Sequence, residues 1–162
     1  MNQLFLDCDG VLADFDIVSK QIFGQDPREA EVCLGTDRFW SRIRQRDNFY
    51  RHLPLTADAM ELYQAVAHLN PILLTGCPDG GWAEPQKIAW AAHHFPRAKI
   101  ITCRSKDKSL YIQKPGDVLV DDYLRYKHLW EQAGGIFVHH VSAKRSIAHL
   151  EKLGLPVSTA QG

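Results

Sequence analysis

The stretch LFLDCDGVLADF, residues 4–15, begins as an apolar run and contains two carboxylates separated by one residue. If the run is a strand, side chains at i and i+2 project to the same side, so Asp7 and Asp9 lie together. Gly10 then permits the tight turn that ends the strand. Two anions this close repel each other unless positive charge intervenes, and Mg²⁺ is a hard cation that binds carboxylate oxygens. The stretch therefore predicts a metal site at the carboxyl end of the first strand.

Four further short apolar runs resemble buried parallel strands. Helical patterns separate most of them, and this alternation is typical of an α/β fold, whose ligands bind at the carboxyl ends of the strands. We therefore predict an α/β protein with a parallel sheet flanked by helices. The predicted strands after the first are PILLTG (71–76), AKIITC (98–103), DVLVDD (117–122) and GIFVHH (135–140).

Helices are predicted where apolar residues recur at helical spacing. The helix predicted over residues 56–70 is expected to bury a stripe made of Met60, Tyr63, Val66 and Ala67. The other helices predicted in the second half of the chain are 84–95, 122–135 and 142–154.

Residues 15–70 carry helix signals and no convincing strand. Asp26 can cap a helix that has Pro27 at its first position, and residues 37–47 have helical character. A helical insertion directly after the carboxylate pair is expected to form a cap over whatever the first strand presents. We therefore divide the chain into an α/β core, residues 1–14 and 71–162, and a helical cap, residues 15–70.

Composition narrows the classes of protein and partner. The 162 residues fit one domain with a small insertion, and 19 basic residues balance 19 acidic ones, so no overall field attracts long nucleic acid or an anionic membrane. The four cysteines form no Cys-x-x-Cys pair. The chain opens without the features of a signal peptide, and no apolar run approaches the roughly 20 residues that span a bilayer. These observations predict a cytoplasmic protein that binds neither membrane nor long nucleic acid.

A second acidic pair, Asp121 and Asp122, ends the run DVLVDD. Together with Asp7 and Asp9 it places four carboxylates at the ends of two predicted strands. An isolated Asp-x-Asp commonly does no more than end a strand and solvate a turn. Four such carboxylates are costly to assemble without a cation, so we predict one shared metal site.

A hydroxyl, a glycine and two lysines have the character of a phosphate site. Thr75 ends the run ILLTG, and Gly76 lets backbone N–H groups approach an anion closely. The segment CRSKDKS, residues 103–109, offers Lys106 and Lys108, either of which could place a point charge on a phosphate. A lysine considered alone is ordinarily a solvated surface residue, so the residues by themselves leave the choice between the two lysines open.

In this order, DCDGVLADF, ILLTG, SKDKS and VLVDD resemble the motifs of the haloacid dehalogenase-like (HAD) phosphatases, and the resemblance covers nearly the whole chain. It implies a Rossmann-like parallel sheet with a small helical cap inserted after the first strand. It also implies Mg²⁺-dependent phosphoryl transfer in which Asp7 attacks phosphorus to form an aspartyl-phosphate. Asp9 would protonate the leaving oxygen and later activate water.

The resemblance also implies roles for the remaining motif residues. Mg²⁺ would be held by Asp7, the backbone carbonyl of Asp9 and Asp121, with Asp122 next to these ligands. Within the superfamily the chain is most similar to the 5'(3')-deoxyribonucleotidase branch, which has a Lys-x-x-Trp helix like the one in EPQKIAWAAHHF. The Arg-x-Lys-type segment of that branch favours Lys108 as the phosphate lysine. The residues implied to bind phosphoryl oxygens are Thr75, Gly76 and Lys108.

The cap is expected to contact the substrate. Phe39 and Trp40 share one side of a predicted cap helix, and with Phe15 they could form a wall on which a base stacks, as in the deoxyribonucleotidases. Packing within the cap is the ordinary alternative. Arg42 belongs to a row of arginines at i, i+4 spacing that either reaches a substrate anion or faces solvent.

Three functions fit these residues. The favoured one is a phosphomonoesterase acting on a small phosphate ester, above all a deoxynucleoside monophosphate. A second keeps the site and changes the substrate to a sugar phosphate or the 3'-phosphate end of a nucleic acid. A third is a non-catalytic nucleotide-binding protein, against which the presence of every expected chemical group counts. The sequence leaves the oligomeric state open, with a homodimer as one option.

Overall fold

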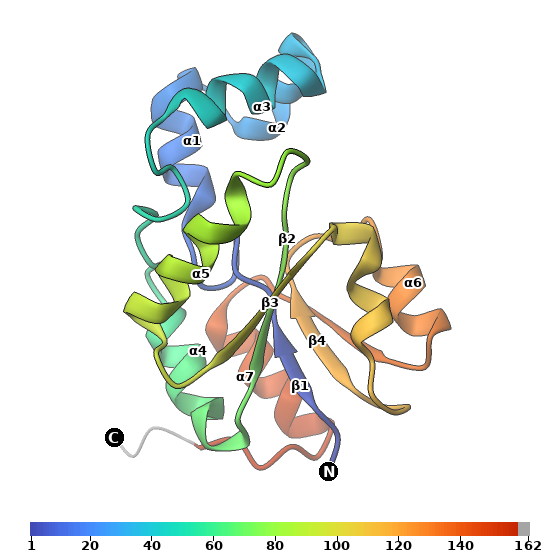
Figure 1. The fold of residues 1–162 in the computed structure, drawn as a ribbon. Coiled ribbons are helices and arrows are strands. Elements are labelled where there is room, and N and C mark those ends of the chain that lie inside the picture. The colour runs from blue at the N-terminus through green and yellow to red at the C-terminus, as the bar shows by residue number, and fades with distance from the viewer. Residues whose placement is uncertain (159–162) are drawn as a thin grey trace.

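A parallel sheet of five strands forms the centre of the molecule (Figure 1). The computed structural model describes residues 1–158. The strands, all five of them predicted, are β1 (Leu4–Leu6), β2 (Ile72–Gly76), β3 (Lys99–Cys103), β4 (Val118–Asp121) and β5 (Ile136–His139). Their order in the sheet is β3-β2-β1-β4-β5, and Phe5 in the middle strand is in register with Ile72 on one side and Leu119 on the other. The predicted α/β fold is confirmed.

Helices cover both faces of this sheet. They are α4 (Ala59–Val66), α5 (Ala83–His94), α6 (Lys127–Gln132), α7 (Ala143–Lys152) and the 3-10 helix η2 (Ser105–Tyr111). Because side chains alternate across a strand, Leu4 and Leu6 join the larger apolar cluster with buried residues of α4, α5 and α7. Phe5 points to the other face and packs edge-on against Trp130 of α6, with ring centroids 5.5 Å apart. The helix η2 contacts both β2 and α6.

The helix predicted over residues 56–70 is present as α4, followed by a 3-10 turn, η1 (Ala67–Leu69). The predicted stripe is only partly correct, because Val66 is fully buried and Tyr63 packs against the core, but Met60 does not face it. Met60 is 39% exposed. Two apolar stripes offset by one residue overlap in this segment, and the contact of α4 with α7 selects the stripe with the smaller side chains. The buried residues of α4 are Ala59, Leu62, Ala65 and Val66.

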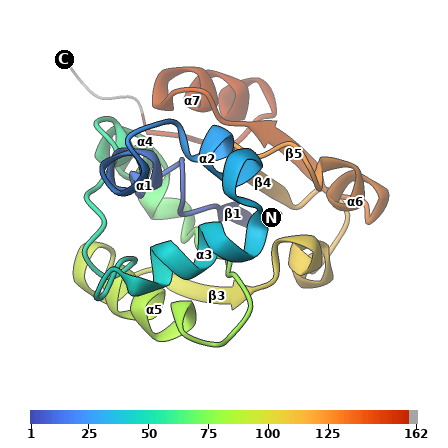
Figure 2. The same cartoon turned by 90° about the horizontal axis from the view of Figure 1, so that it is seen from above.

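Three short helices lie over the carboxyl ends of the strands (Figures 1 and 2). They are α1 (Phe15–Phe23), α2 (Pro27–Leu34) and α3 (Thr36–Gln45). Asp14 and Asp26 begin α1 and α2 by accepting hydrogen bonds from backbone N–H groups of the first turn. The stacked rings of Phe23 and Phe39, with centroids 4.9 Å apart, join α1 to α3. These three helices cover the carboxyl-terminal edge of the sheet, whereas α4 packs beside α7 in the helical layer on one face of the sheet.

The chain after β4 runs as a loop before it becomes helical. A helix was expected over residues 122–135, but α6 occupies only the middle of that range. The Asp121 carboxylate accepts a hydrogen bond from the backbone N–H of Tyr123 at 2.9 Å, which turns the chain so that Asp122 and Tyr123 line the cavity described below. The helices found within residues 1–158 are all too short or too polar to cross a bilayer.

Candidate active site

The loop after β1 holds the first carboxylate pair in a tight turn. The Cys8 carbonyl accepts hydrogen bonds from the backbone N–H groups of three following residues, at 2.8 to 3.1 Å. Gly10 has a φ of 80°, and a Cβ at this position would collide with the carboxylate of Asp122. Only glycine therefore satisfies both the turn and the close approach of the loop after β4.

Asp7 and Asp9 both line the cavity beneath the cap, as their spacing predicts. Asp7 is 6% exposed, and the Asp9 side chain keeps 26% of its surface exposed. Cys8 turns into the apolar core between them, and burial raises the pKa of its thiol well above the usual value. Cys8 is therefore a packing residue, and the two carboxylates are the groups of this loop that face the cavity.

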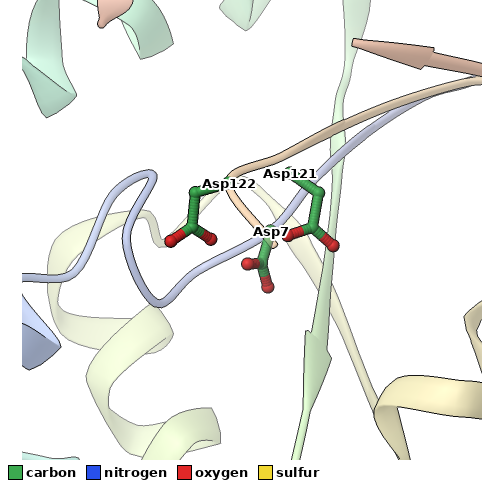
Figure 3. Close-up of side chains that lie close together, drawn as sticks. All are labelled: Asp7, Asp121 and Asp122. Carbon is green, nitrogen blue, oxygen red and sulfur yellow. The ribbon is translucent and has the colours of Figure 1, made fainter. Parts of the chain in front are cut away.

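Three carboxylates meet where β1 and β4 end (Figure 3). Asp7, Asp121 and Asp122 each offer one oxygen, and these oxygens all lie within 4.8 Å of one another. Burial and the charge of Asp7 raise the pKa of Asp121 to about 7. Burial and the charges of Asp7 and Asp121 raise the pKa of Asp122 to about 9. A cation bound between these oxygens would reduce the repulsion among the three carboxylates.

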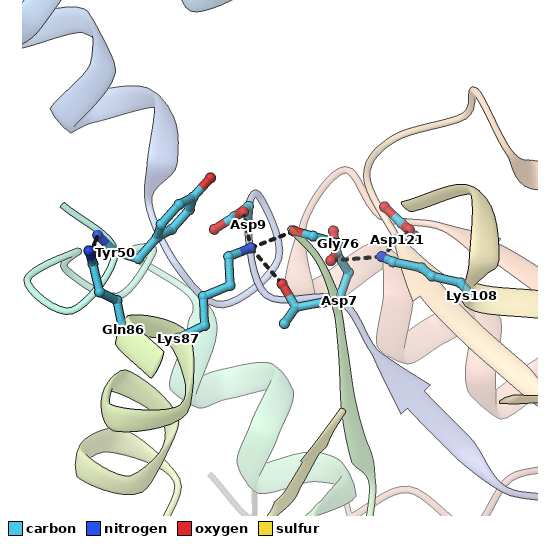
Figure 4. Close-up of polar contacts among 9 residues, drawn as sticks. Asp7, Asp9, Tyr50, Gly76, Gln86, Lys87, Lys108 and Asp121 are labelled. Atoms are coloured by element: carbon cyan, nitrogen blue, oxygen red, sulfur yellow. Dashed lines mark hydrogen bonds and ion pairs between the residues drawn. The ribbon is translucent and has the colours of Figure 1, made fainter. Parts of the chain in front are cut away.

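Lys108 lies between two of these carboxylates (Figure 4). Its Nζ donates hydrogen bonds to Asp7 Oδ1 and to Asp121 Oδ2, both at 2.9 Å, and the residue is 7% exposed. Burial lowers the pKa of Lys108, but the two carboxylates outweigh burial and hold it above its usual value. Burial raises the pKa of Asp7, but the nearby ammonium group of Lys108 outweighs burial, so this pKa lies below its usual value. Lys106 is exposed, so the structure brings Lys108, and not Lys106, to the carboxylates.

A second buried lysine, Lys87 of α5, was given no role from sequence (Figure 4). Its Nζ donates to Asp9 Oδ2 at 2.8 Å, to Thr75 Oγ1 at 2.8 Å and to the Gly76 carbonyl at 2.7 Å. It is 3% exposed and lies 4.4 Å from the centre of the Tyr50 ring. Burial lowers the pKa of Lys87, and the Asp9 carboxylate more than offsets this. At Asp9, burial together with the charge of Asp7 raises the pKa more than Lys87 lowers it.

The pattern of α5 contained a signal for this lysine. The residues that α5 buries recur at helical spacing, and a lysine occupies one position of an otherwise apolar stripe. A lysine on a core stripe is rarely buried without a partner, which is the reason to look for an acidic group facing it. The buried residues of α5 are Ala83, Lys87, Trp90 and Ala91.

Thr75 and Gly76 end β2 next to these groups. Thr75 is fully buried and its hydroxyl accepts from Lys87. Gly76 approaches η2 so closely that a Cβ would collide with the side chain of Ser105. The two residues predicted to end β2 at the phosphate site are therefore tightly packed. Ser105, which lines the cavity, carries a hydroxyl group that sequence reasoning did not select.

Charge balance tests whether the site fits Mg²⁺. When all six of its ionisable side chains are charged, the site carries four negative and two positive charges, so two negative charges are left over. A bound cation favours this state because it lowers the raised pKa values of Asp121 and Asp122. A divalent cation balances the two charges left over, and Mg²⁺ prefers hard oxygen ligands such as the three clustered carboxylates. The donor set therefore fits Mg²⁺. The residues counted are Asp7, Asp9, Asp121, Asp122, Lys87 and Lys108.

The cavity above these groups has a volume of about 370 Å³. Of the predicted cap residues, three line it, namely Phe15, Phe39 and Trp40. Tyr50, which sequence reasoning did not select, also lines it and lies with its ring centroid 6.3 Å from that of Phe15. The site therefore has polar groups at its base and aromatic rings toward the cap.

Arg42 does not join these residues. Its guanidinium donates to the Ile22 carbonyl at 3.1 Å and lies 5.0 Å from the centre of the Phe23 ring. Both contacts tie α3 to α1 within the cap. Arg42 is absent from the lining of the cavity formed by the described residues, so we leave it out of the proposed substrate site.

Comparison with known proteins bears on the fold. No protein-family model matches the chain, and no curated protein matches it. Among solved structures, a HAD-superfamily hydrolase from Ehrlichia chaffeensis is similar, with 13% identity and a TM-score of 0.54 over 96% of this chain and 100% of that one. A hydrolase from Streptococcus pneumoniae TIGR4 has 14% identity and a TM-score of 0.49 over 95% and 98% of the two chains. The first likeness shows that this chain has a HAD-like fold.

Proposed function

We propose that this protein is a Mg²⁺-dependent phosphomonoesterase that works through an aspartyl-phosphate on Asp7. One observation carries the proposal: the buried Nζ of Lys108 bridges Asp7 and Asp121 at the ends of adjacent strands, beside a third carboxylate. Phosphoryl transfer needs a positioned nucleophile and concentrated positive charge around the phosphoryl oxygens. The base of the cavity offers both.

Asp7 supplies the nucleophile. One of its carboxylate oxygens attacks the phosphorus of a phosphate monoester, the bond between phosphorus and the ester oxygen breaks, and the phosphoryl group is left on Asp7. Because Asp7 is buried and hydrogen-bonded to Lys108, its carboxylate is held in one orientation before the substrate arrives. That ordering lowers the entropy that must be lost in the transition state.

Asp9 carries the proton. It donates a proton to the departing ester oxygen, so that an alcohol leaves. Its carboxylate then accepts a proton from the water that attacks the aspartyl-phosphate. Inorganic phosphate leaves, the Asp7 carboxylate is restored, and Asp9 is protonated again.

The hydrogen bonds of the two buried lysines assign them different roles. An ammonium group has three N–H donors. Lys87 uses all three on Asp9, Thr75 and Gly76, so it serves as a positioning residue that ties Asp9 to the end of β2. Lys108 uses two, on Asp7 and Asp121, and keeps the third for a phosphoryl oxygen.

The metal complements these groups. When bound, Mg²⁺ supplies positive charge that offsets the repulsion between the phosphoryl oxygens and the attacking carboxylate. Asp7 and Asp121 would hold it together with the backbone carbonyl of Asp9, and the carboxylate of Asp122 lies in the same cluster. Gly10 keeps Asp122 there, since any side chain at that position would displace its carboxylate.

The proposed substrate is a nucleoside monophosphate, above all a deoxynucleotide. Support comes from the rings of Phe15, Trp40 and Tyr50, which line the cavity above the carboxylates. Stacking on aromatic side chains is worth about 1 to 3 kcal/mol per base. A sugar phosphate would gain little from these rings, so it is the less favoured substrate.

The test is phosphate release from deoxy- and ribonucleoside monophosphates, sugar phosphates and 4-nitrophenyl phosphate, with Mg²⁺ and with EDTA. We expect Mg²⁺-dependent turnover with deoxynucleotides preferred. Asp7→Asn should abolish turnover, while Asp47→Asn, at an exposed position outside the cavity, should retain it. Preference for sugar phosphates would correct the substrate. Nucleotide binding without any phosphate release would make the protein a binding protein instead.

A further inference from the structure

A second hollow adjoins the catalytic cavity between α3 and the loop that joins β2 to α5. Its volume is about 530 Å³, and it is continuous with the catalytic cavity because Trp40, Ser105 and Lys106 line both. Lys106 precedes Lys108 by two residues of η2, which rises about 2 Å per residue, so the hollow begins beside the proposed phosphate site. We call it the side groove. The residues that line the side groove alone are Asp37, Ser41, Arg44, Asp79, Trp82 and Arg104.

Positive charge gathers in the side groove, although the chain as a whole has a net charge of zero. Arg44 comes from α3, Arg104 follows β3, and Lys106 lies in η2. Arg104 forms an exposed ion pair with Asp79 at 3.0 Å. Within residues 1–158, the ion pairs found include neither Arg44 nor Lys106. With Asp37 as the second acid, three cations face two carboxylates, and two of the cations are free to bind an anion.

Aromatic rings stand beside these cations. Trp82 packs against Tyr50 with ring centroids 5.5 Å apart, which holds its indole in place. Arg44 and Trp82 both lie close to Gly80. A Cβ atom placed on this glycine would be 3.5 Å from Nη1 of Arg44 and 3.1 Å from Cδ1 of Trp82. Arg44 therefore reaches from the cap to the Gly80 loop of the core, near the Trp82 indole. A guanidinium next to an indole matches a ligand that joins an anionic group to a flat or sugar surface.

We infer that the side groove binds a second phosphate group of the substrate, an inference that rests on the proposed phosphomonoesterase function. The reacting phosphate lies at Asp7. The further phosphate lies against Arg44, which has no ion-pair partner among the described residues, and against Arg104, whose ion pair with Asp79 is exposed and therefore weak enough to be exchanged for a phosphate. Guanidinium groups bind phosphate through paired N–H donors. The two acids in the groove keep its net positive charge small, which suits one phosphate group rather than a long polyanion.

Two kinds of substrate present this chemistry. In a nucleoside 3',5'-bisphosphate, the second phosphate belongs to the same nucleotide. In a short 5'-phosphorylated oligonucleotide, it is the phosphodiester that leads to the next nucleotide. Both substrates offer phosphate oxygens to Arg44. Only the oligonucleotide carries a further base, which could stack on the ring of Trp82 in the side groove.

The experiment compares KM and kcat for thymidine 5'-monophosphate, thymidine 3',5'-bisphosphate, a 5'-phosphorylated thymidine dinucleotide and 4-nitrophenyl phosphate. The variants are Arg44→Ala, Arg104→Ala and the double variant. Arg38→Ala is the matched control, because Arg38 is also exposed on α3 but lines neither hollow. We expect a second phosphate to lower KM by about tenfold or more, the worth of one charge-assisted contact. The double variant should lose this advantage and keep its activity on 4-nitrophenyl phosphate.

The outcomes separate the inference from the function on which it rests. An advantage for the bisphosphate alone, or for the dinucleotide alone, supports the groove and identifies the source of the second phosphate. Equal KM values for all nucleotides, with 4-nitrophenyl phosphate still hydrolysed, overturn the inference and leave the phosphomonoesterase function intact. If no substrate is hydrolysed, the proposed function fails. Calorimetry with the bisphosphate then decides whether the side groove binds phosphate. If Arg44→Ala binds the bisphosphate as tightly as the wild type does, the inference about the groove is overturned as well.

Discussion

Replacement of Lys87 by methionine tests whether a buried lysine positions the acid Asp9. Methionine keeps the apolar stem but removes the three hydrogen bonds to Asp9, Thr75 and Gly76. Breaking a buried ion pair costs about 3 to 5 kcal/mol. Because the Asp9 side chain is 26% exposed, water can partly replace the lysine, and we expect a value near the lower end. For a chain of this size, a loss of about 3 kcal/mol lowers the melting temperature by about 6 to 12 °C.

The catalytic effect should depend on the leaving group. A departing nucleoside alkoxide needs a proton, and general acid catalysis contributes about 10² to 10⁴ in rate, so kcat/KM for a nucleoside monophosphate should fall by about 10² or more. Departing 4-nitrophenolate needs no proton, so kcat/KM for 4-nitrophenyl phosphate should fall by less than about tenfold. The ratio kcat/KM is the right quantity, because it reports steps up to the aspartyl-phosphate and not its hydrolysis. Lys108→Met is the control, since it should lower both values.

Two results would refute this reasoning. If folded Lys87→Met loses kcat/KM by the same factor on both substrates, Lys87 acts on the phosphate or on the general structure, and not through Asp9. If neither value falls, Asp9 needs no support from Lys87. Circular dichroism and the melting temperature, measured first, establish that the variant is folded under the assay conditions.

Three further experiments with single substitutions test other parts of the site and the core. Lys108→Ala should lower kcat/KM far more than Lys106→Ala, because Lys108 contacts Asp7 whereas Lys106 is exposed; the reverse order in a phosphate-release assay would move the phosphate lysine. Trp40→Ala should raise KM about tenfold for nucleoside monophosphates and less for 4-nitrophenyl phosphate, and equal changes would assign Trp40 to packing. Asp117→Asn should lower the free energy of unfolding, measured in urea, by about 2 to 4 kcal/mol, because this buried carboxylate accepts three backbone N–H bonds that an amide cannot all satisfy. Burial raises the pKa of Asp117, but these hydrogen bonds outweigh it and hold the pKa below its usual value. The stabilisation is therefore complete above about pH 4 and lost as pH falls through the folded pKa, so a difference between wild type and variant that stays constant in acid would contradict the assignment.

Local pattern was sufficient to predict the five strands and the residues at their carboxyl ends. Asp7, Thr75 and Asp121 each end or follow a short continuous apolar run, and such a run is what a strand buried on both faces requires. Because the carboxyl ends of parallel strands share one edge of a sheet, their meeting could be predicted without coordinates. The turn at Gly10 also followed from sequence alone, although its close contact with Asp122 did not.

Pairing between distant side chains was decided only by the tertiary structure. The residues by themselves did not distinguish Lys106 from Lys108, and only the family resemblance favoured Lys108. Side-chain directions within an irregular segment follow from packing, and η2 turns Lys108 toward Asp7. Lys87 and Asp9 are 78 residues apart, so no local pattern relates them. They meet because α5, which packs against β3, carries Lys87 to the end of β2. Burial there makes an unpaired ammonium or carboxylate costly and so favours the pair. The burial of a strand can be predicted from the apolar residues of its own short segment. The partner of a buried charge can lie far away in the sequence, and it is then determined only by which elements the fold brings together.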